Sequence, residues 1–184
     1  MEEKKVRVAV IGIGNIGTAH ATAIYEGRVD GMVLSALCDS DKEKAARLCE
    51  QFPSVPVFTD SHSLIESGMV DAVIISTPHY YHPPIAIDAF EHKLHVLSEK
   101  PIGVFGLAAK EMVDAATKSG KLFAVMFNQR TNKLFAEARR IVAEGRLGEL
   151  KRSVWIITNW YRKQAYYDSG SWRATWSGEG AVFL

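Results

Sequence analysis

The 184-residue sequence has little cysteine and little excess charge. Its two cysteines, Cys38 and Cys49, have no neighbours typical of a redox motif or a metal site, so we expect both to pack as small apolar side chains. The net charge is +1, and no basic run is longer than a pair such as Arg139-Arg140. A sequence without a basic footprint is not expected to bind nucleic acid.

Long hydrophobic runs are also missing. No segment approaches the roughly 20 apolar residues that a membrane-spanning helix needs. The charged start, residues 1–5, precedes an apolar run too short for the core of a signal peptide. We therefore expect a cytoplasmic protein that is not bound to a membrane. The composition, 47% hydrophobic and 23% charged, is typical of a folded globular protein.

A glycine-rich turn follows the first apolar run, Val6 to Ile11, and a helical pattern follows the turn. Strand, tight turn and helix in this order are typical of a site for the pyrophosphate of a dinucleotide. Gly12 would permit the sharp turn, Gly14 would let the pyrophosphate approach the backbone, and Gly17 would let the helix pack on the strand. N–H groups at the helix start would face the anion. The expected contacts are Gly12, Ile13, Gly14, Asn15, Ile16 and Gly17.

An acidic residue supports this interpretation, because glycine turns also join strands and helices that bind nothing. Asp39 lies 22 residues beyond Gly17, at the end of a second apolar run, Met32 to Cys38. Its carboxylate would accept hydrogen bonds from the adenosine ribose hydroxyls. It would also repel a 2′-phosphate, which favours NAD over NADP. Ser40 and Lys42 could bind that phosphate, so NADP remains the alternative.

Apolar and helical segments alternate up to residue 126. Ser40 or Asp41 can cap a helix that reaches about Phe52, with its apolar residues on one face: Ala45, Ala46, Leu48 and Cys49. Further helices are expected around residues 64–65, 85–90 and 107–119. The expected strands are 6–11, 32–38, 57–58, 71–76, 95–98 and 122–126. This alternation predicts an α/β fold, a doubly wound parallel sheet of the Rossmann type, formed by residues 1–126.

The character of the sequence changes near residue 127. A basic amphipathic helix, Lys133 to Glu144, precedes an alternating segment, Leu150 to Trp160, that we interpret as a long strand. All four tryptophans lie in this region: Trp155, Trp160, Trp172 and Trp176. Residues 127–184 therefore predict the start of a second, α+β domain. An apolar run without a closing element ends the sequence, so we expect this domain to be incomplete.

Two further loops carry unusual sequences. Ligands of doubly wound sheets lie outside the carboxyl ends of the strands, where the strand order reverses, so the loops after the first, fourth and fifth expected strands should be neighbours. Ser76, Thr77 and Pro78 follow the fourth strand, and Glu99-Lys100 follows the fifth. Lys100 would hydrogen-bond a substrate hydroxyl and accept its proton while the carbon loses hydride to nicotinamide. A strand terminator at Thr77-Pro78 and a solvated Glu-Lys ion pair are the alternatives.

Together these motifs resemble one family. The turn Gly-Ile-Gly-Asn-Ile-Gly, Asp39, the Thr-Pro-x-x-x-His pattern that ends at His82, and Glu99-Lys100-Pro101 are similar to the Gfo/Idh/MocA oxidoreductases. The resemblance implies that Lys100 is catalytic and touches both substrate and nicotinamide. It also implies that Glu99 holds the nicotinamide ribose and that the peptide bond before Pro101 is cis.

The same resemblance assigns the remaining coenzyme contacts. Ser76, Thr77 and Pro78 would line the coenzyme, and His82 belongs to the same pattern, although packing at a helix start is its other interpretation. We expect no metal site, because the remaining histidines show no ligand-like spacing: His20, His62, His79 and His92.

Substrate contacts are expected in the second part of the chain. Asn128 and Arg130 lie at the domain junction, within reach of the cleft. The aromatic tail, with Trp172 and Arg173, would either bind a polyol or sugar or form a face buried against the first domain or another subunit. In the family, an Asp and a His on a second-domain helix contact the substrate, and no matching helix occurs before Leu184.

The resemblance thus implies an NAD-dependent oxidoreductase, with NADP as the other coenzyme, that acts on a secondary alcohol of a sugar, inositol or related polyol. It also implies a homo-oligomer for the full-length form. The alternative is a non-catalytic module that binds NAD and serves as a sensor or binds a partner.

Overall fold

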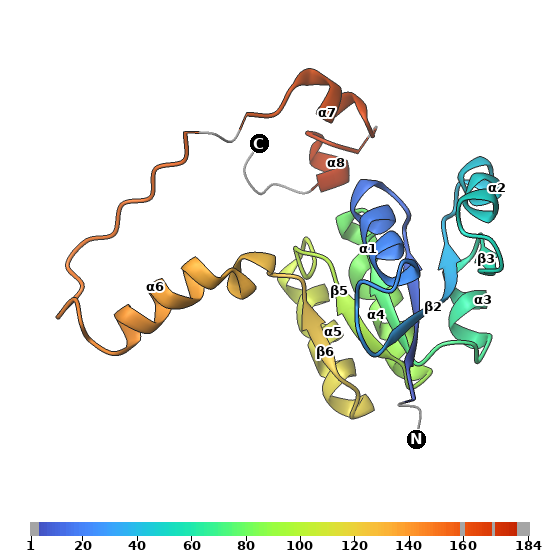
Figure 1. Cartoon of the computed structure of the whole chain (residues 1–184), viewed down its shortest axis with the longest axis horizontal. Helices are drawn as coiled ribbons and strands as arrows, with labels where there is room; N and C mark the ends of the chain where they lie inside the picture. The colour runs from blue at the N-terminus through green and yellow to red at the C-terminus, as the bar shows by residue number, and fades with distance from the viewer. Residues whose placement is uncertain (1–3, 159–160, 171, 180–184) are drawn as a thin grey trace.

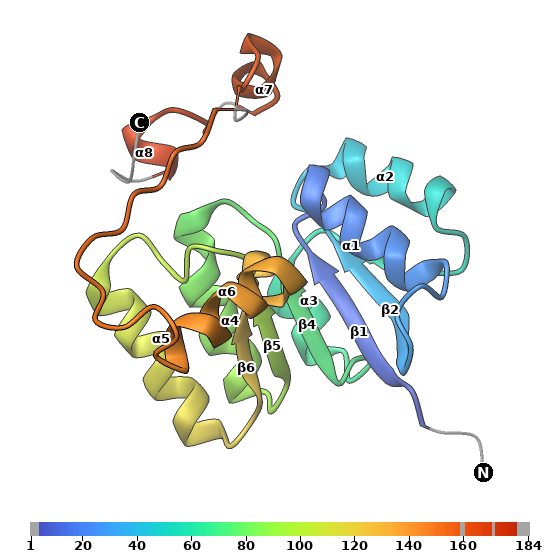
Figure 2. The same ribbon diagram turned by 60° about the vertical axis from the view of Figure 1, so that its left-hand side comes forward.

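A six-stranded parallel sheet forms the centre of the computed structural model, which describes residues 4–158, 161–170 and 172–179. The strand order is β3-β2-β1-β4-β5-β6, and helices cover both faces (Figures 1 and 2). The strands are β1 (Val6–Ile11), β2 (Met32–Cys38), β3 (Val57–Phe58), β4 (Ala72–Ile75), β5 (His95–Ser98) and β6 (Phe123–Val125). The predicted doubly wound α/β fold is therefore confirmed, and the order reverses between β1 and β4.

Helices connect the strands as the alternation predicted. They are α1 (Asn15–Tyr25), α2 (Lys42–Gln51), α3 (Ser61–Glu66), the 3₁₀ helix η1 (His79–Tyr81), α4 (His82–Glu91) and α5 (Gly106–Ser119). Of the two predicted caps for α2, Asp41 is the one used, since its carboxylate accepts from the N–H groups of Glu43 and Lys44. Gly120, with φ of 68°, ends α5 in the left-handed conformation.

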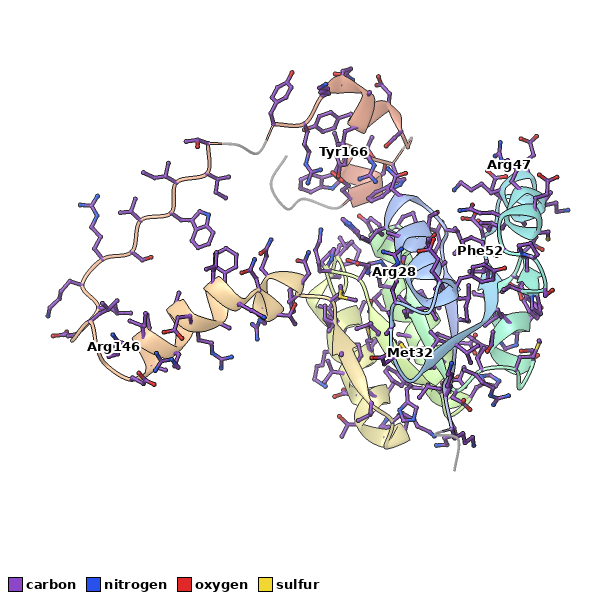
Figure 3. All side chains as sticks on the ribbon, viewed as in Figure 1. Arg28, Met32, Arg47, Phe52, Arg146 and Tyr166 are labelled. Atoms are coloured by element: carbon purple, nitrogen blue, oxygen red, sulfur yellow. The ribbon has the colours of Figure 1, made fainter. Side chains whose placement is uncertain are left out.

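Each face of the sheet has its own apolar core because successive strand side chains point to opposite faces. On one face, Val8 and Val10 pack with residues of α1 and α2. Phe52, at the end of α2, is 2% exposed and belongs to this core (Figure 3). On the other face, Ala9 and Ile11 pack with residues of α3, α4 and α5. Covering on both faces explains why the strands read as continuous apolar runs.

Two details of the sheet and its helices differ from the predictions. Ala46 and Cys49 are exposed, because α2 meets the sheet only along the stripe that contains Ala45 and Leu48. Cys49 therefore does not pack as an apolar core residue. Cys38 does, and burial raises the pKa of its thiol to about 12.

The region after β6 contains η2 (Asn128–Thr131), α6 (Lys133–Ala143), α7 (Gln164–Asp168) and α8 (Trp176–Glu179). The prediction of a strand from 150 to 160 is wrong for residues 150–158, while 159 and 160 lie outside the described residues. A strand requires a hydrogen-bonded neighbour, and no part of the described chain pairs with this segment, which runs away from the sheet (Figure 1). Arg146, after α6, also lies far from the sheet (Figure 3).

The end of the described chain returns to the sheet. Figures 1 and 2 place α8 beyond the carboxyl ends of the strands. The Nδ1 atom of His79, in η1, donates to the carbonyl oxygen of Glu179 over 3.0 Å. The His79 and Trp172 rings meet edge to face, with 5.1 Å between their centroids. Residues 172–179 thus contact the loop that follows β4. Within the described residues, no helix combines the length and apolar character needed to cross a membrane.

Candidate functional site

The strand register brings three loops together at the carboxyl edge of the sheet. The Ser76 N–H donates to the carbonyl oxygen of Ile11, and the Glu99 N–H donates to that of Ile75, both over 2.8 Å. The glycine turn after β1, the loop after β4 and the loop after β5 are therefore direct neighbours. This confirms the predicted convergence, and it occurs at the reversal of strand order, where doubly wound sheets bind ligands.

The space around the three glycines of the turn differs. A Cβ on Gly12, whose φ is +88°, would lie 2.7 Å from the backbone nitrogen of Thr77. A Cβ on Gly17 would lie 2.0 Å from the carbonyl oxygen of Gly12. A Cβ on Gly14 would meet nothing within 4 Å, and its φ of −84° suits any residue. Gly12 and Gly17 are therefore needed by the fold, whereas Gly14 leaves open space at the start of α1.

The amino terminus of α1 is available to an anion. Gly14 is the N-cap and provides no side-chain acceptor, and the first turn has no acidic residue. The first N–H groups of a helix have no partners within the helix, and the helix dipole adds a positive potential there. Asn15 and Ile16, in this first turn, are exposed. The turn thus has the geometry that suits a pyrophosphate.

Asp39 fastens the glycine turn to the end of β2. Its carboxylate accepts from the N–H of Ile13 over 2.9 Å and from the N–H of Asp41 over 3.0 Å. Lys44 contributes an ammonium 3.4 Å away, and Asp39 is only 8% exposed. This position beside the turn is the one expected of a residue that binds the adenosine ribose. That role remains a prediction.

Two unpaired hydroxyls lie in the loop after β4. The Oγ of Ser76 and the Oγ1 of Thr77 are buried and have no hydrogen-bond partner among the described residues. Buried hydroxyls are normally hydrogen-bonded. Pro78 follows them as the residue before η1. The loop after β4 therefore holds two buried hydroxyls that could still accept or donate a hydrogen bond, and it lies beside the glycine turn.

His82 joins the loop after β4 to the loop after β5. Its Nε2 lies 2.8 Å from the carbonyl oxygen of Thr77, its Nδ1 lies 2.8 Å from that of Pro101, and the side chain is fully buried. Both ring nitrogens are used within the protein. The geometry therefore favours packing at the start of α4 over direct contact with a coenzyme.

The side chains of Glu99 and Lys100 do not pair with each other. The Oε1 of Glu99 lies 3.0 Å from the Nε2 of His20, and its Oε2 accepts from the backbone N–H of Lys100 over 3.2 Å. The Lys100 side chain is exposed, and its ammonium has no hydrogen-bond or ion-pair partner in the described part of the chain. The bond before Pro101 is cis, as predicted. A solvated Glu-Lys ion pair is not what the structure contains.

The hydrogen bonds to Glu99 outweigh its burial. Burial alone raises the pKa of a carboxyl group, but the hydrogen bond from His20 and the N–H of Lys100 hold the pKa of Glu99 below its ordinary value. The role of His20 was not predictable from the sequence, because nothing in the spacing of α1 indicates that its sixth residue faces the end of β5. The ring nitrogens of His62 lie near Asp88 and Glu66, which the sequence also did not indicate.

The candidate substrate residues lie at two places. Asn128 and Arg130, in η2, are exposed after β6. Trp172 contacts His79, whose pKa is lowered mainly by burial, so Trp172 lies beside the loop after β4. Arg173 donates to the hydroxyl of Tyr166 over 2.6 Å, and its buried Nε has no partner among the described residues. Figure 3 shows Tyr166 in the part of the chain formed by α7 and α8.

Known proteins match this chain in sequence and in structure. Inositol 2-dehydrogenase 4 of Saccharopolyspora erythraea is 35% identical over 149 residues, which cover 80% of this chain and 44% of that protein. D-glucoside 3-dehydrogenase of Escherichia coli is 32% identical over 150 residues, which cover 82% of this chain and 42% of that protein. The chain thus spans less than half the length of these curated relatives.

Two solved structures have the same fold. Scyllo-inositol dehydrogenase from Lactobacillus casei, with bound NAD(H) and scyllo-inositol, superposes with a TM-score of 0.74 at 25% identity and covers 79% of this chain and 43% of its own. The WlbA dehydrogenase from Bordetella pertussis, in complex with NADH and UDP-GlcNAcA, gives 0.82 at 27% and covers 95% of this chain and 53% of its own.

The family profile described as an oxidoreductase family with an NAD-binding Rossmann fold matches residues 6–127. The chain therefore belongs to the Gfo/Idh/MocA family of NAD-binding oxidoreductases.

Proposed function

We propose that this chain binds NAD at the carboxyl edge of its sheet and supplies Lys100 for the oxidation of a secondary alcohol of a sugar, inositol or related polyol. The observation that carries the proposal is the convergence of an uncapped helix start, two buried hydroxyls and the loop of Lys100 beside the reversal of strand order. Among the described residues, neither the two hydroxyls nor the Lys100 ammonium has a hydrogen-bond partner. Dehydrogenases of inositol and of a glucoside among the relatives support the substrate class.

The adenosine half of NAD would bind along the glycine turn. The first N–H groups of α1 would bind the pyrophosphate over Gly14. Asp39 would accept from the ribose hydroxyls with the part of its carboxylate that the N–H groups of Ile13 and Asp41 leave free. A carboxylate at this position disfavours a 2′-phosphate by charge repulsion, which supports NAD as the preferred coenzyme.

The nicotinamide half would lie between the loops after β4 and β5. Ser76 and Thr77 would direct their unpaired hydroxyls toward it, and Glu99, which is held as a carboxylate, would accept from its ribose. When bound, the nicotinamide supplies the acceptor for the hydride that leaves the substrate carbon. Pro78, at the start of η1, would form the wall of this part of the site.

Lys100 would act on the substrate hydroxyl. Its amine, in the unprotonated form, would accept the hydroxyl proton as the carbon loses hydride, so that the alcohol becomes a carbonyl. Because the side chain has no partner within the described residues, it is free to reach a substrate. Asn128 and Arg130 after β6, and Trp172 with Arg173 beside η1, would contact the remaining hydroxyls of the polyol.

Steady-state kinetics of the protein that carries this chain test the proposal. We expect reduction of NAD with at least one member of a panel of inositols, glucosides and other polyols. Lys100→Met should lower kcat by about 10² or more, since that is the usual contribution of a general base. The affinity for NADH, measured by fluorescence titration, should stay close to that of the wild type.

Lys110→Met is the matched control, because Lys110 is an exposed lysine on α5 that pairs with Asp114. It should leave kcat unchanged. Wild-type rates in Lys100→Met would contradict the catalytic role of Lys100. Tight NADH binding without turnover of any polyol would favour the non-catalytic NAD-binding module instead.

A further inference from the structure

His20 and Glu99 form a short contact between α1 and the loop after β5. His20 lies on α1, directly after the glycine turn, and Glu99 lies directly after β5, 79 residues later. The Nε2 of His20 and the Oε1 of Glu99 are 3.0 Å apart, and the two side chains are 20% and 12% exposed. A contact this well shielded from water is stronger than an exposed pair, and salt screens it less.

The contact fixes the orientation of the Glu99 carboxylate. Because the pKa of Glu99 is low despite burial, the group is ionised and acts only as an acceptor. The Nε2 of His20 must therefore carry the proton and donate to Oε1. The N–H of Lys100 donates to Oε2 over 3.2 Å. With a donor on each oxygen, the carboxylate is held in one rotamer while each oxygen keeps a further lone pair for a ligand.

We propose that His20 is a positioning residue for the nicotinamide half of the coenzyme: it orients Glu99 toward the ribose beside Lys100. The inference rests on the proposed function, and it adds a residue that none of the recognised motifs contains. Since Glu99 and Lys100 are adjacent in the chain, the same contact sets the direction in which the loop after β5 leaves the strand.

This role makes a prediction that a purely structural role does not. His20 should affect ligands that reach Glu99 and should not affect ligands that occupy only the glycine turn and Asp39. NADH contains both halves of the coenzyme, whereas ADP contains only the adenosine half. The two ligands therefore separate an effect on Glu99 from general damage to α1.

Isothermal titration of the wild type and of His20→Ala with NADH and with ADP tests the inference. Removal of the donor should weaken NADH binding about tenfold, since a hydrogen bond to a charged group is lost, and change ADP binding by less than about twofold. His20→Gln, whose amide can donate from a similar position, should recover most of the affinity. In a double-mutant cycle with Glu99→Ala, the two losses should be non-additive, because each variant alone removes the whole contact.

His62→Ala serves as the matched control, since His62 lies on α3 and pairs with Asp88; it should change neither affinity. If His20→Ala fails to fold, His20→Asn, whose shorter amide does not reach Glu99, replaces it with the same expected result. Unchanged NADH affinity, or an equal loss for NADH and ADP, would overturn the inference and leave the proposed function intact. A wild-type protein that binds ADP but not NADH would overturn both.

Discussion

Gly14 and Gly17 lie three residues apart in the same turn, and the structure predicts opposite consequences when each is replaced by alanine. The Gly17 Cβ would lie 2.0 Å from the carbonyl oxygen of Gly12, where real Cβ atoms essentially never approach closer than 3.0 Å. Both atoms are fixed to the backbone, so no rotamer relieves the clash and α1 must move. The Gly14 Cβ would meet nothing within 4 Å.

The magnitudes follow from these distances. Overpacking costs about 1–3 kcal/mol or more, and alanine recovers about 1 kcal/mol of helix propensity. Because the Gly17 clash is severe, we expect a net loss of roughly 2 kcal/mol, which lowers Tm by about 4–8 °C in a chain of this size. At Gly14, the entropy gain of about 0.4–1 kcal/mol offsets the poorer N-cap, which costs about 0.5 kcal/mol, so Tm should hardly change.

For coenzyme binding, the larger effect is expected at Gly14. Gly14→Ala should weaken NADH binding about tenfold or more, because the methyl group would occupy the space through which a pyrophosphate approaches the backbone. Thermal unfolding followed by circular dichroism gives the stability, and NADH fluorescence titration gives the affinity. A Gly14→Ala variant that binds NADH like the wild type, or a Gly17→Ala variant with an unchanged Tm, would refute the reasoning.

Three further variants test other parts of the structure. Asp39→Asn keeps an acceptor for the N–H of Ile13 but removes the charge, so the preference for NADH over NADPH should fall about tenfold in titrations; an unchanged ratio would contradict the role of Asp39. Hydrogen bonds from Arg7 lower the pKa of Asp71 from 3.8 to about 2, so this pair stabilises the fold fully above pH of about 4 and loses its effect as the pH falls toward 2. Arg7→Met should therefore lower the urea midpoint near pH 7 but not near pH 2, and equal losses at both would be the contrary result. Phe90→Ala should cost about 3–5 kcal/mol of unfolding free energy, because Phe90 is 1% exposed and its ring meets Phe123 edge to face at 5.6 Å; a loss below about 1 kcal/mol would contradict its place in the core.

The local sequence pattern was sufficient to predict the strands and main helices of residues 6–126. The run from His95 to Ser98 predicted β5 with the bounds that the structure has, because an apolar centre with polar residues at both ends is typical of a short strand within a covered sheet. Gly120 marked the end of α5 for a similar reason, since only glycine takes the left-handed conformation without cost. From these elements, the rule for strand order also placed the loops after β1, β4 and β5 together.

The sequence pattern did not predict structure that depends on contacts between residues far apart in the chain. Residues 150–158 alternate as a strand would, yet no strand of the described chain pairs with them, and alternation cannot supply the missing neighbour. The contacts of His20 with Glu99 and of His82 with Pro101 were equally hidden, because each joins residues that only the packed loops bring within hydrogen-bond distance.

The sequence by itself determined the strands and main helices of residues 6–126, the glycine turn and the order of the loops, because these follow from the local periods of strands and helices and from a general rule of sheet topology. Only the tertiary structure decided which atoms meet across those loops. Spacing along a chain does not fix the direction of a side chain to within the few tenths of an ångström that a hydrogen bond requires. For that reason no pattern in the sequence indicated His20, which the structure gives to Glu99 as its side-chain partner.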